Sequence, residues 1–570
     1  MPYIVGISSG IFSIAKQTQE REGAIQYAGI ARKVSGFPIM QGVTFAQIDL
    51  ESIAEFMEPN LVESMKRVRE QLGLSYGFHS ESASFGGEFP YLDESIEDDY
   101  RRAHERVFRI LQGAANIEAE YVLLHSSEST SFLLLGKDLQ PTRLVDIWGR
   151  PMRDWLKSDE EYVKELMDWL VENYQKYIEQ LGLPHLSATV SSIFSRKYEK
   201  LRFDKLKTQT DIASEEEEKI TKEAIREGLV EYVSSNDQEY GTERFAYFVV
   251  AKWMELRGDP LWKKIIDITI KYFAKLDNKE PREWLINRGI NPDELVVENS
   301  RFYNDFRLWV PAVSARYIWG HFFPEKAPGG GSRYENMDFK KIIKEKKMPF
   351  ILETPMSGTA IEEWTRMPNP LQMYYLVKEV NQEFPYMGLA IDLEHMIAGN
   401  INPDIVVELL PEDAGKLVRV IHTGYPSPIM PAHIHIPIGS EQMWYLYYIY
   451  YKLRKKGFGK DGNMKYWLVF ERGGPEEVRQ SIEAIKIIVA FLEKETDPFD
   501  IKKHPEKYKQ FYGVDFGQLA SIERQQAIIR EYSDEPLKGL LQVPEEDHGI
   551  LGRAAVEKGK AEEWKKEKYR

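Results

Sequence analysis

Two kinds of segment alternate along most of this chain. Short runs of mainly apolar residues predict buried β-strands, and longer stretches whose apolar positions recur every three or four residues predict amphipathic helices. Eight apolar runs stand out, at residues 3–9, 42–50, 74–79, 121–125, 348–353, 387–392, 417–422 and 466–471. Each run is followed, directly or after an interruption, by a helical pattern.

Strands that alternate with helices form parallel sheets with right-handed crossovers, and eight such units close into a barrel. We therefore predict an α/β fold, a (β/α)8 barrel. The alternation is interrupted after the fourth strand by roughly two hundred mostly helical residues, far more than an ordinary loop needs. The predicted divisions are 1–128 and 338–500 for the two barrel halves, 129–337 for a helical insertion and 501–570 for a C-terminal extension.

Composition narrows the class of protein. The 570 residues include no cysteine, which excludes disulfides and thiolate metal sites. The formal net charge of −15 argues against non-specific binding to duplex DNA, which depends on Lys and Arg. No run is long enough to span a bilayer and no signal segment begins the chain, so we expect a cytoplasmic protein that does not bind membranes. Missing cysteine beside abundant Glu, Lys and Tyr is typical of thermophile proteins.

Six of the eight predicted strands end on a side chain that can bind a metal ion. These side chains are His79, His125, Glu353, Asp392, His422 and Glu471. In a parallel barrel the carboxyl ends of all strands meet at one rim, where barrel enzymes place their chemistry. Six such groups on one rim predict a metal site, because cations would relieve the repulsion among the converging carboxylates.

Three more histidines extend this set to nine. His395 follows Asp392 by one helical turn, and His433 and His435 form a His-x-His pair. In an extended segment such a pair points both imidazoles to one face. Neutral imidazole is a common zinc ligand.

In this order of ligands the chain resembles the xylose isomerase-like barrel superfamily and, within it, the endonuclease IV family of zinc-dependent apurinic/apyrimidinic endonucleases in DNA repair. The resemblance covers roughly residues 1–128 and 338–495 and leaves out the insertion. It implies three ions. The implied ligands are His79, His125 and Glu353 for the first ion, Glu353, Asp392, His422 and Glu471 for the second, and His395, His433 and His435 for the third.

The chain departs from that family in two respects, one at the third metal site and one in a loop that contacts DNA. The family has an aspartate where this chain has His433, and three imidazoles still suit zinc. The family also inserts bulky side chains into DNA from the loop after its first metal histidine. In this chain that loop, residues 80–87, is small and acidic, with Phe85 as its one candidate wedge.

Three functions remain open from the sequence. The first is a metal-dependent hydrolase of phosphoesters, in which a hydroxide between two ions attacks phosphorus, with Glu353, Asp392 and Glu471 as the catalytic carboxylates. Its cofactor would be two or three Zn²⁺, with Mn²⁺ an option at the second site, and its substrate a small molecule or a nucleic acid. The alternative is a sugar isomerase or epimerase in which Glu353 or Glu471 moves a proton. A non-catalytic scaffold is disfavoured by the complete ligand set.

The predicted insertion starts at the rim that holds the ligands, because it follows the strand that ends on His125. We therefore expect it to act as a lid that narrows the entrance. Aromatic residues near its end offer either a packed core or a wall for substrate stacking; they are Trp309, Tyr317, Trp319 and Phe322.

Overall fold

The computed structural model describes most of the chain, and every structural statement below concerns the residues it describes. These are 2–9, 29–35, 42–50, 52–80, 90–94, 96–127, 129–131, 145–157, 163–169, 171–172, 184–234, 250–294, 306–323, 338–355, 363–426, 433–471 and 475–513. Predictions about the loop with Phe85 and about the residues after 513 fall outside them.

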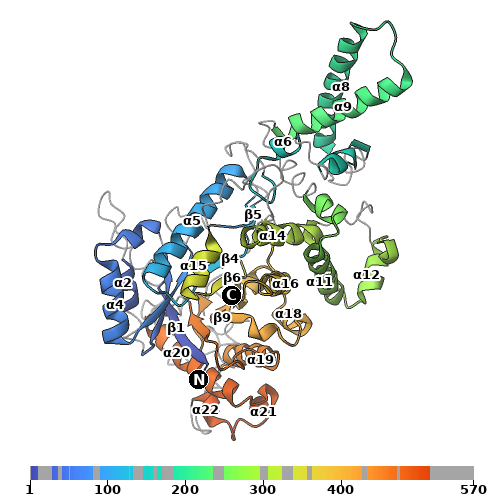
Figure 1. Ribbon diagram of the computed structural model, residues 1–570. Coiled ribbons are helices and arrows are strands. Elements are labelled where there is room, and N and C mark those ends of the chain that lie inside the picture. Colours follow the sequence, from blue (N-terminus) through green and yellow to red (C-terminus); the bar gives the residue numbers. More distant parts are fainter. Residues whose placement is uncertain are drawn as a thin grey trace, which may run out of the picture. The chain divides into compact units, whose positions relative to one another are not determined.

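Eight parallel strands close into a barrel in the order β1-β12-β9-β8-β6-β4-β3-β2 (Figure 1). Each strand therefore pairs with its neighbours in the sequence of barrel strands, and β1 closes the ring by pairing with β12. The strands are β1 (Tyr3–Ser8), β2 (Phe45–Asp49), β3 (Ser75–His79), β4 (Val122–His125), β6 (Phe350–Glu353), β8 (Met387–Asp392), β9 (Val418–His422) and β12 (Tyr466–Phe470). The predicted (β/α)8 barrel is confirmed.

Helices surround the strands on the outside of the barrel (Figure 1). They are α2 (Ile30–Ser35), α4 (Leu61–Leu72), α5 (Glu97–Asn116), α15 (Phe339–Lys346), α16 (Pro370–Val380), α17 (Leu393–Ala398), α18 (Pro403–Leu409), α19 (Glu441–Lys455) and α20 (Pro475–Glu493). Local sequence explains where they start. In α16, for example, Asn369 and Gln372 form a reciprocal capping box around Pro370, which needs no backbone N–H at the first helical position.

Two short antiparallel ribbons follow strands of the barrel. β5 (Ser129–Ser131) pairs with β7 (Glu363–Thr365), and β10 (Tyr425–Pro426) pairs with β11 (His433–Ile434). The chain divides into two compact units, residues 1–437 with 442–495, and residues 438–441 with 496–570; the second contains α21 (Pro498–Lys503) and α22 (Lys509–Tyr512). No described helix is both long enough and apolar enough to cross a bilayer.

The inside of the barrel is a packed apolar core directly beneath the predicted site. Its residues are Phe45, Tyr121, Leu123, Ile351, Ala390, Val420, Trp467 and Val469. Five of these stand two positions before His125, Glu353, Asp392, His422 and Glu471, and strand side chains two apart point to the same face. The alternation of side chains along each of these strands therefore places its metal-competent side chain in the layer directly above this apolar core.

Gly77 of β3 leaves the space that the ring of Tyr121 occupies. A Cβ atom at this position would lie 2.6–2.8 Å from three carbons of that buried ring. We expect Gly77→Ala to lower the free energy of unfolding by about 1–3 kcal/mol, the usual cost of overpacking a core. Gly462→Ala is the matched control, because its Cβ would meet nothing within 4 Å. Equal urea midpoints for the two variants would contradict this reading of the core.

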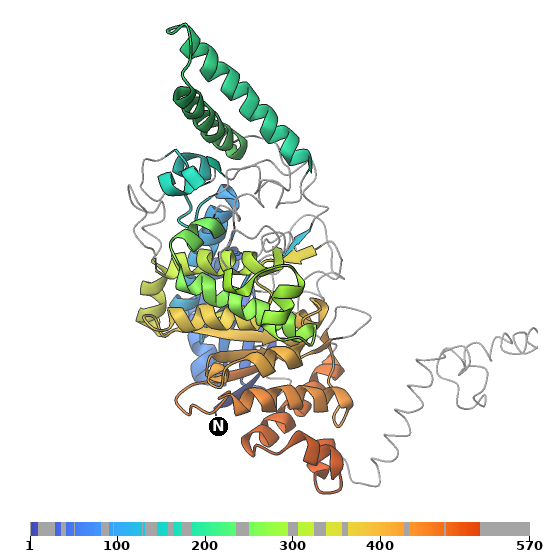
Figure 2. The ribbon, with the colours of Figure 1, turned by 90° about the vertical axis from the view of Figure 1, so that its right-hand side faces the viewer.

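The stretch between β4 and β6 is largely helical where it is described, as expected. It includes α6 (Met152–Trp155), α8 (Pro184–Leu206), α9 (Ser214–Ser234), α11 (Pro260–Leu276), α12 (Pro281–Asn287) and α14 (Phe306–Phe322). Helices α8 and α9 run side by side as a hairpin (Figure 2). Ion pairs such as Lys205–Glu216, 2.8 Å apart, join the two helices.

Helices α11 and α14 pack on the flank of the barrel. Gln372 of α16 donates a hydrogen bond of 3.1 Å to Thr269 of α11, and the ring of Phe322 in α14 lies 5.3 Å from that of Phe350 in β6. Trp309, Tyr317 and Phe322 have no exposed surface, so core packing accounts for them. Whether another part of residues 129–337 covers the barrel mouth stays a prediction.

A buried histidine, His104 of α5, meets the half-buried His321 of α14. The rings of His104 and His321 are 3.8 Å apart, and Tyr100 is hydrogen-bonded to both residues. Burial lowers the pKa of His104 to about 4. Burial, and then the neighbouring His104, lower the pKa of His321 well below its usual value. Both rings are therefore neutral at pH 7.

Because the folded protein keeps these histidines neutral, we expect its free energy of unfolding to fall in mild acid. Below pH 6.5 the unfolded chain takes up a proton on His104 that the folded chain refuses until pH 4, so stability falls as the pH falls through this window. At about 1.4 kcal/mol per pH unit, His104 alone accounts for about 3 kcal/mol between pH 6.5 and 4. Urea unfolding at pH 4.5 and 7.5 should show a smaller difference for His104→Phe than for the wild type, and an equal difference in the two proteins would contradict this account.

Candidate metal centre

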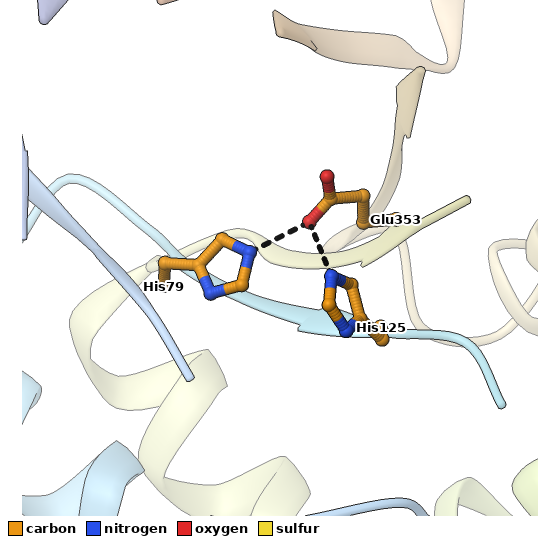
Figure 3. Close-up of side chains that lie close together, drawn as sticks. All are labelled: His79, His125 and Glu353. Carbon is orange, nitrogen blue, oxygen red and sulfur yellow. Dashed lines mark hydrogen bonds and ion pairs between the residues drawn. The ribbon is translucent and has the colours of Figure 1, made fainter. Parts of the chain in front are cut away.

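Three of the predicted ligands form one buried group at the barrel mouth. Figure 3 shows the rings of His79 and His125 turned toward the same oxygen of Glu353. Nε2 of His79 lies 2.8 Å and Nε2 of His125 lies 3.5 Å from Oε2 of Glu353. The Nδ1 of His79 donates to the carbonyl of Ser80, 3.0 Å away, so in a neutral His79 the lone pair would be on Nε2, the nitrogen that faces the centre.

A second group shares Glu353 with the first. Nδ1 of His422 lies 2.6 Å from Oε1 of Glu353 and 3.7 Å from Oδ2 of Asp392. Within each group the ligand atoms all lie within 4.8 Å of one another. The two oxygens of Glu353 therefore face different groups, and this carboxylate stands where it could bridge two cations.

Asp392 is both the last residue of β8 and the N-cap of α17. Its Oδ1 accepts hydrogen bonds of 2.7 and 3.1 Å from the backbone N–H groups of Glu394 and His395. An N-cap of this kind fixes the carboxylate against the helix end. The other oxygen, Oδ2, is thereby turned toward His422.

The Asp-x-x-His spacing brings His395 into the same cluster. Its Nδ1 donates to the carbonyl of Thr354 at 2.9 Å, and its Nε2 lies 3.7 Å from Oδ2 of Asp392. The hydroxyl of Thr354 in turn accepts a 2.9 Å hydrogen bond from the backbone N–H of Asp392. Thr354, which the sequence analysis did not single out, thus connects the end of β6 to the end of β8, next to Glu353 and Asp392.

The third predicted ion site is only partly described. His433 lies in β11 beside β10, and β10 packs against α17, the helix of His395. The side chain of His433 is outside the described residues, and His435 is partly buried. A third site made by these three histidines stays a prediction.

Glu471 lies on the other side of His422 from Glu353. Its Oε1 is 3.4 Å from Nε2 of His422 and accepts a 2.9 Å hydrogen bond from the amide of Gln47. In this geometry Glu471 is next to the second group without being one of the three residues that compose it. Its predicted role as a ligand stays a prediction.

The charges of the cluster compensate one another. Burial opposes the charged form of each group, yet the facing histidines, His422 first, hold the pKa of Glu353 well below its usual value. Burial alone would lower the pKa of His79, but the negative Glu353 raises it to about 9. Burial likewise opposes charge on His422, whereas Glu353 and then Glu471 raise its pKa well above the usual value. Burial lowers the pKa of His125 to about 3.

A carboxylate that sequence reasoning passed over stands at the end of β2. Asp49 accepts a hydrogen bond from the hydroxyl of Ser8, and its partner in the pairing of β2 with β3 is His79. Burial, and then the negative charge of Glu471, raise the pKa of Asp49. The position of Asp49 could have been predicted from the sequence, because Phe45, Gln47 and Asp49 are two residues apart along β2 and therefore point to the same side, the barrel interior.

The donor set fits divalent transition metals. Imidazole nitrogen and carboxylate oxygen are zinc ligands, and a carboxylate-rich group also suits manganese. A cation would replace the protons that His79 and His422 carry, since metal binding and protonation compete for the same lone pairs. The described residues therefore define a buried site able to hold one or two cations.

Comparisons with known proteins find only distant similarity. No protein-family model matches it, and no curated protein matches it. Among solved structures, it is similar to a D-tagatose 3-epimerase-like protein, with 9% identity over 86% of this chain and 99% of the other, and a TM-score of 0.37. It is also similar to an L-ribulose 3-epimerase, with 9% identity over 86% of this chain and 95% of the other, and a TM-score of 0.36. A third similar structure is a 3-keto-D-glucoside 4-epimerase from E. coli, with 9% identity over 86% of this chain and 99% of the other, and a TM-score of 0.33. Identities and TM-scores this low do not bear on the activity of the chain.

Proposed function

We propose that this protein is a metal-dependent isomerase or epimerase of small hydroxy-carbonyl compounds, the class that includes sugars. The observation that carries the proposal is the placement of Glu353 and Glu471 at the two nitrogens of His422, 2.6 and 3.4 Å away. Two buried carboxylates on different sides of one site can serve as the base and the acid of a proton transfer.

The proposed reaction rearranges protons and needs no other reactant. One carboxylate removes the proton from the carbon beside the substrate carbonyl, and the electrons of the C–H bond pass to the carbonyl oxygen and give an enediolate. In epimerisation the other carboxyl group, in its protonated form, donates its proton to the opposite face of the same carbon. In isomerisation the carbon proton is delivered to the neighbouring carbon, and the hydroxyl proton passes between the two oxygens. A cation held by Glu353, Asp392 and His422 would polarise the carbonyl. Glu353 and His422 have no exposed surface, and exclusion of bulk water from a site strengthens the electrostatic interactions inside it.

Phosphoester hydrolysis is the second candidate, and the shared position of Glu353 favours it. A carboxylate that faces two ligand groups is expected in two-metal hydrolases. In the sequence, the third histidine site was what favoured hydrolysis over isomerisation. Because the side chain of His433 lies outside the described residues, that site adds no weight here.

Solvent exchange separates the two reactions without knowledge of the natural substrate. The protein, loaded with Mn²⁺, Co²⁺ or Zn²⁺, is incubated in D₂O with a panel of ketoses and aldoses, and deuterium beside the carbonyl is followed by NMR. We expect incorporation for at least one sugar and its loss in Glu471→Gln. Cleavage of a phosphodiester or of an abasic-site duplex, with no deuterium in any sugar, would overturn the proposal in favour of the second candidate.

A further inference from the structure

Gln47 is a fully buried polar side chain in the barrel interior, in contact with two of the predicted site residues. Its amide nitrogen donates to Glu471 at 2.9 Å. Its carbonyl oxygen lies 2.9 Å from Nε2 of His422 and 2.8 Å from the hydroxyl of Tyr121. One amide thus joins a carboxylate, an imidazole and a phenol.

The direction of these hydrogen bonds follows from what each partner can offer. Oε1 of Glu471 accepts a hydrogen bond from the NH₂ group of Gln47, so the carbonyl of Gln47 faces the other two partners. The carbonyl only accepts, so Tyr121 and His422 both donate to it. Burial, and then Glu471, raise the pKa of Tyr121 well above its usual value, which keeps the phenol protonated as this donor role requires.

A proton fixed on Nε2 decides which nitrogen of His422 can bind a cation. In a neutral imidazole with Nε2–H, the lone pair is on Nδ1. Nδ1 is the nitrogen that faces Glu353 and Asp392. The same amide holds Oε1 of Glu471 and leaves Oε2 of that carboxylate for other contacts.

We propose that Gln47, supported by Tyr121, is a positioning residue that sets His422 as the Nε2–H tautomer and thereby directs Nδ1 to the cation of the second group. This inference rests on the proposed metal-dependent function and names a determinant of its metal site. Gln47 acts through His422 and Glu471. Such outer partners of metal ligands typically change affinity by 10–100-fold when they are removed.

The test measures cation binding directly. Co²⁺ is titrated into chelator-treated full-length protein, and its visible absorption and competition with a chromophoric chelator give the number of sites and their affinities. We expect Gln47→Leu, which keeps the volume of the side chain, to weaken one class of site by about 10–100-fold. Gln372→Leu is the matched control, because Gln372 is also buried and hydrogen-bonded, on the flank of the barrel. It should leave both affinity and spectrum unchanged.

Tyr121→Phe gives a second, milder variant in case Gln47→Leu does not fold. It removes one donor to the Gln47 carbonyl and keeps the ring, so we expect weakening of about tenfold, the low end of the range. In the Zn²⁺-loaded wild type, ¹⁵N-histidine NMR should show the His422 proton on Nε2, assigned with His422→Gln.

Each outcome has a separate meaning. Wild type that binds no Co²⁺ would refute the proposed function itself. If the wild type binds Co²⁺ and the Gln47→Leu or Tyr121→Phe variant binds it with the same affinities and spectrum, only the role of Gln47 is refuted. A proton found on Nδ1 of His422 in the loaded protein would also refute that role.

Discussion

Glu353→Gln should abolish activity and leave the barrel folded. Its two carboxylate oxygens face His79 and His125 on one side and His422 on the other. The amide keeps the size but loses the negative charge that both groups share, and it cannot act as a base. Loss of a general base costs about 10²–10⁴-fold in rate, and loss of a cation bridge adds to it.

The measurement is deuterium exchange beside circular dichroism and Co²⁺ binding. Glu345→Gln is the matched control, an exposed carboxylate in α15. If Glu353→Gln kept wild-type exchange on a substrate that the wild type turns over, the central place given to this carboxylate would be wrong.

Removal of bound cations should lower stability as well as activity. The cluster places two carboxylates with no more than 1% exposure, Glu353 and Asp392, among histidines. A cation that binds only the folded chain adds about 4 kcal/mol per site when its free concentration is a thousand times its dissociation constant. Chelation should therefore shift the urea midpoint down, and added Zn²⁺ or Mn²⁺ should restore it.

The control for this prediction is the double variant His79→Gln with His422→Gln. It lacks a ligand in each group, so its urea midpoint should not respond to chelator. An unchanged midpoint in the wild type, measured after elemental analysis has shown that cations were present and removed, would contradict the prediction.

The fold could be predicted because its signals are local and repeated. Each barrel strand is a short apolar run, and each predicted strand is present near its expected limits. The ends were less exact: Glu471 was expected inside its strand, whereas β12 ends at Phe470. A strand end depends on the pairing of its neighbours, which the run itself does not contain.

The site was predictable where a residue type and a strand end coincide. His79, His125, Glu353, Asp392 and His422 were named on that basis, and the structure brings them into two groups. Gln47 and Thr354 were missed because they act through contacts between strands. Gln47, for example, contacts Glu471 near the other end of the barrel sequence, and no local spacing of residues predicts such a pair.

The packing of α14 was also beyond the sequence. Its aromatic residues fit both a core and a substrate wall, since both need large apolar side chains. Contact of Phe322 with Phe350 decides for the core. A helix in a long insertion can thus pack on the flank of the barrel. Residue patterns alone do not distinguish such a helix from one that forms a lid.

The division of the first ligand group by the insertion has a consequence for how the protein is made. His79 and His125 precede the insertion, and Glu353 follows it. The intervening chain of about 230 residues takes roughly 10–45 s to synthesise at about 5–20 residues per second. During that interval the two histidines emerge from the ribosome without their shared carboxylate, and β1 must wait longer still for β12. Metal capture at this group would therefore be a late event of biogenesis. The stage most exposed to aggregation and to chaperones is the one at which the amino-terminal strands have emerged without their partners.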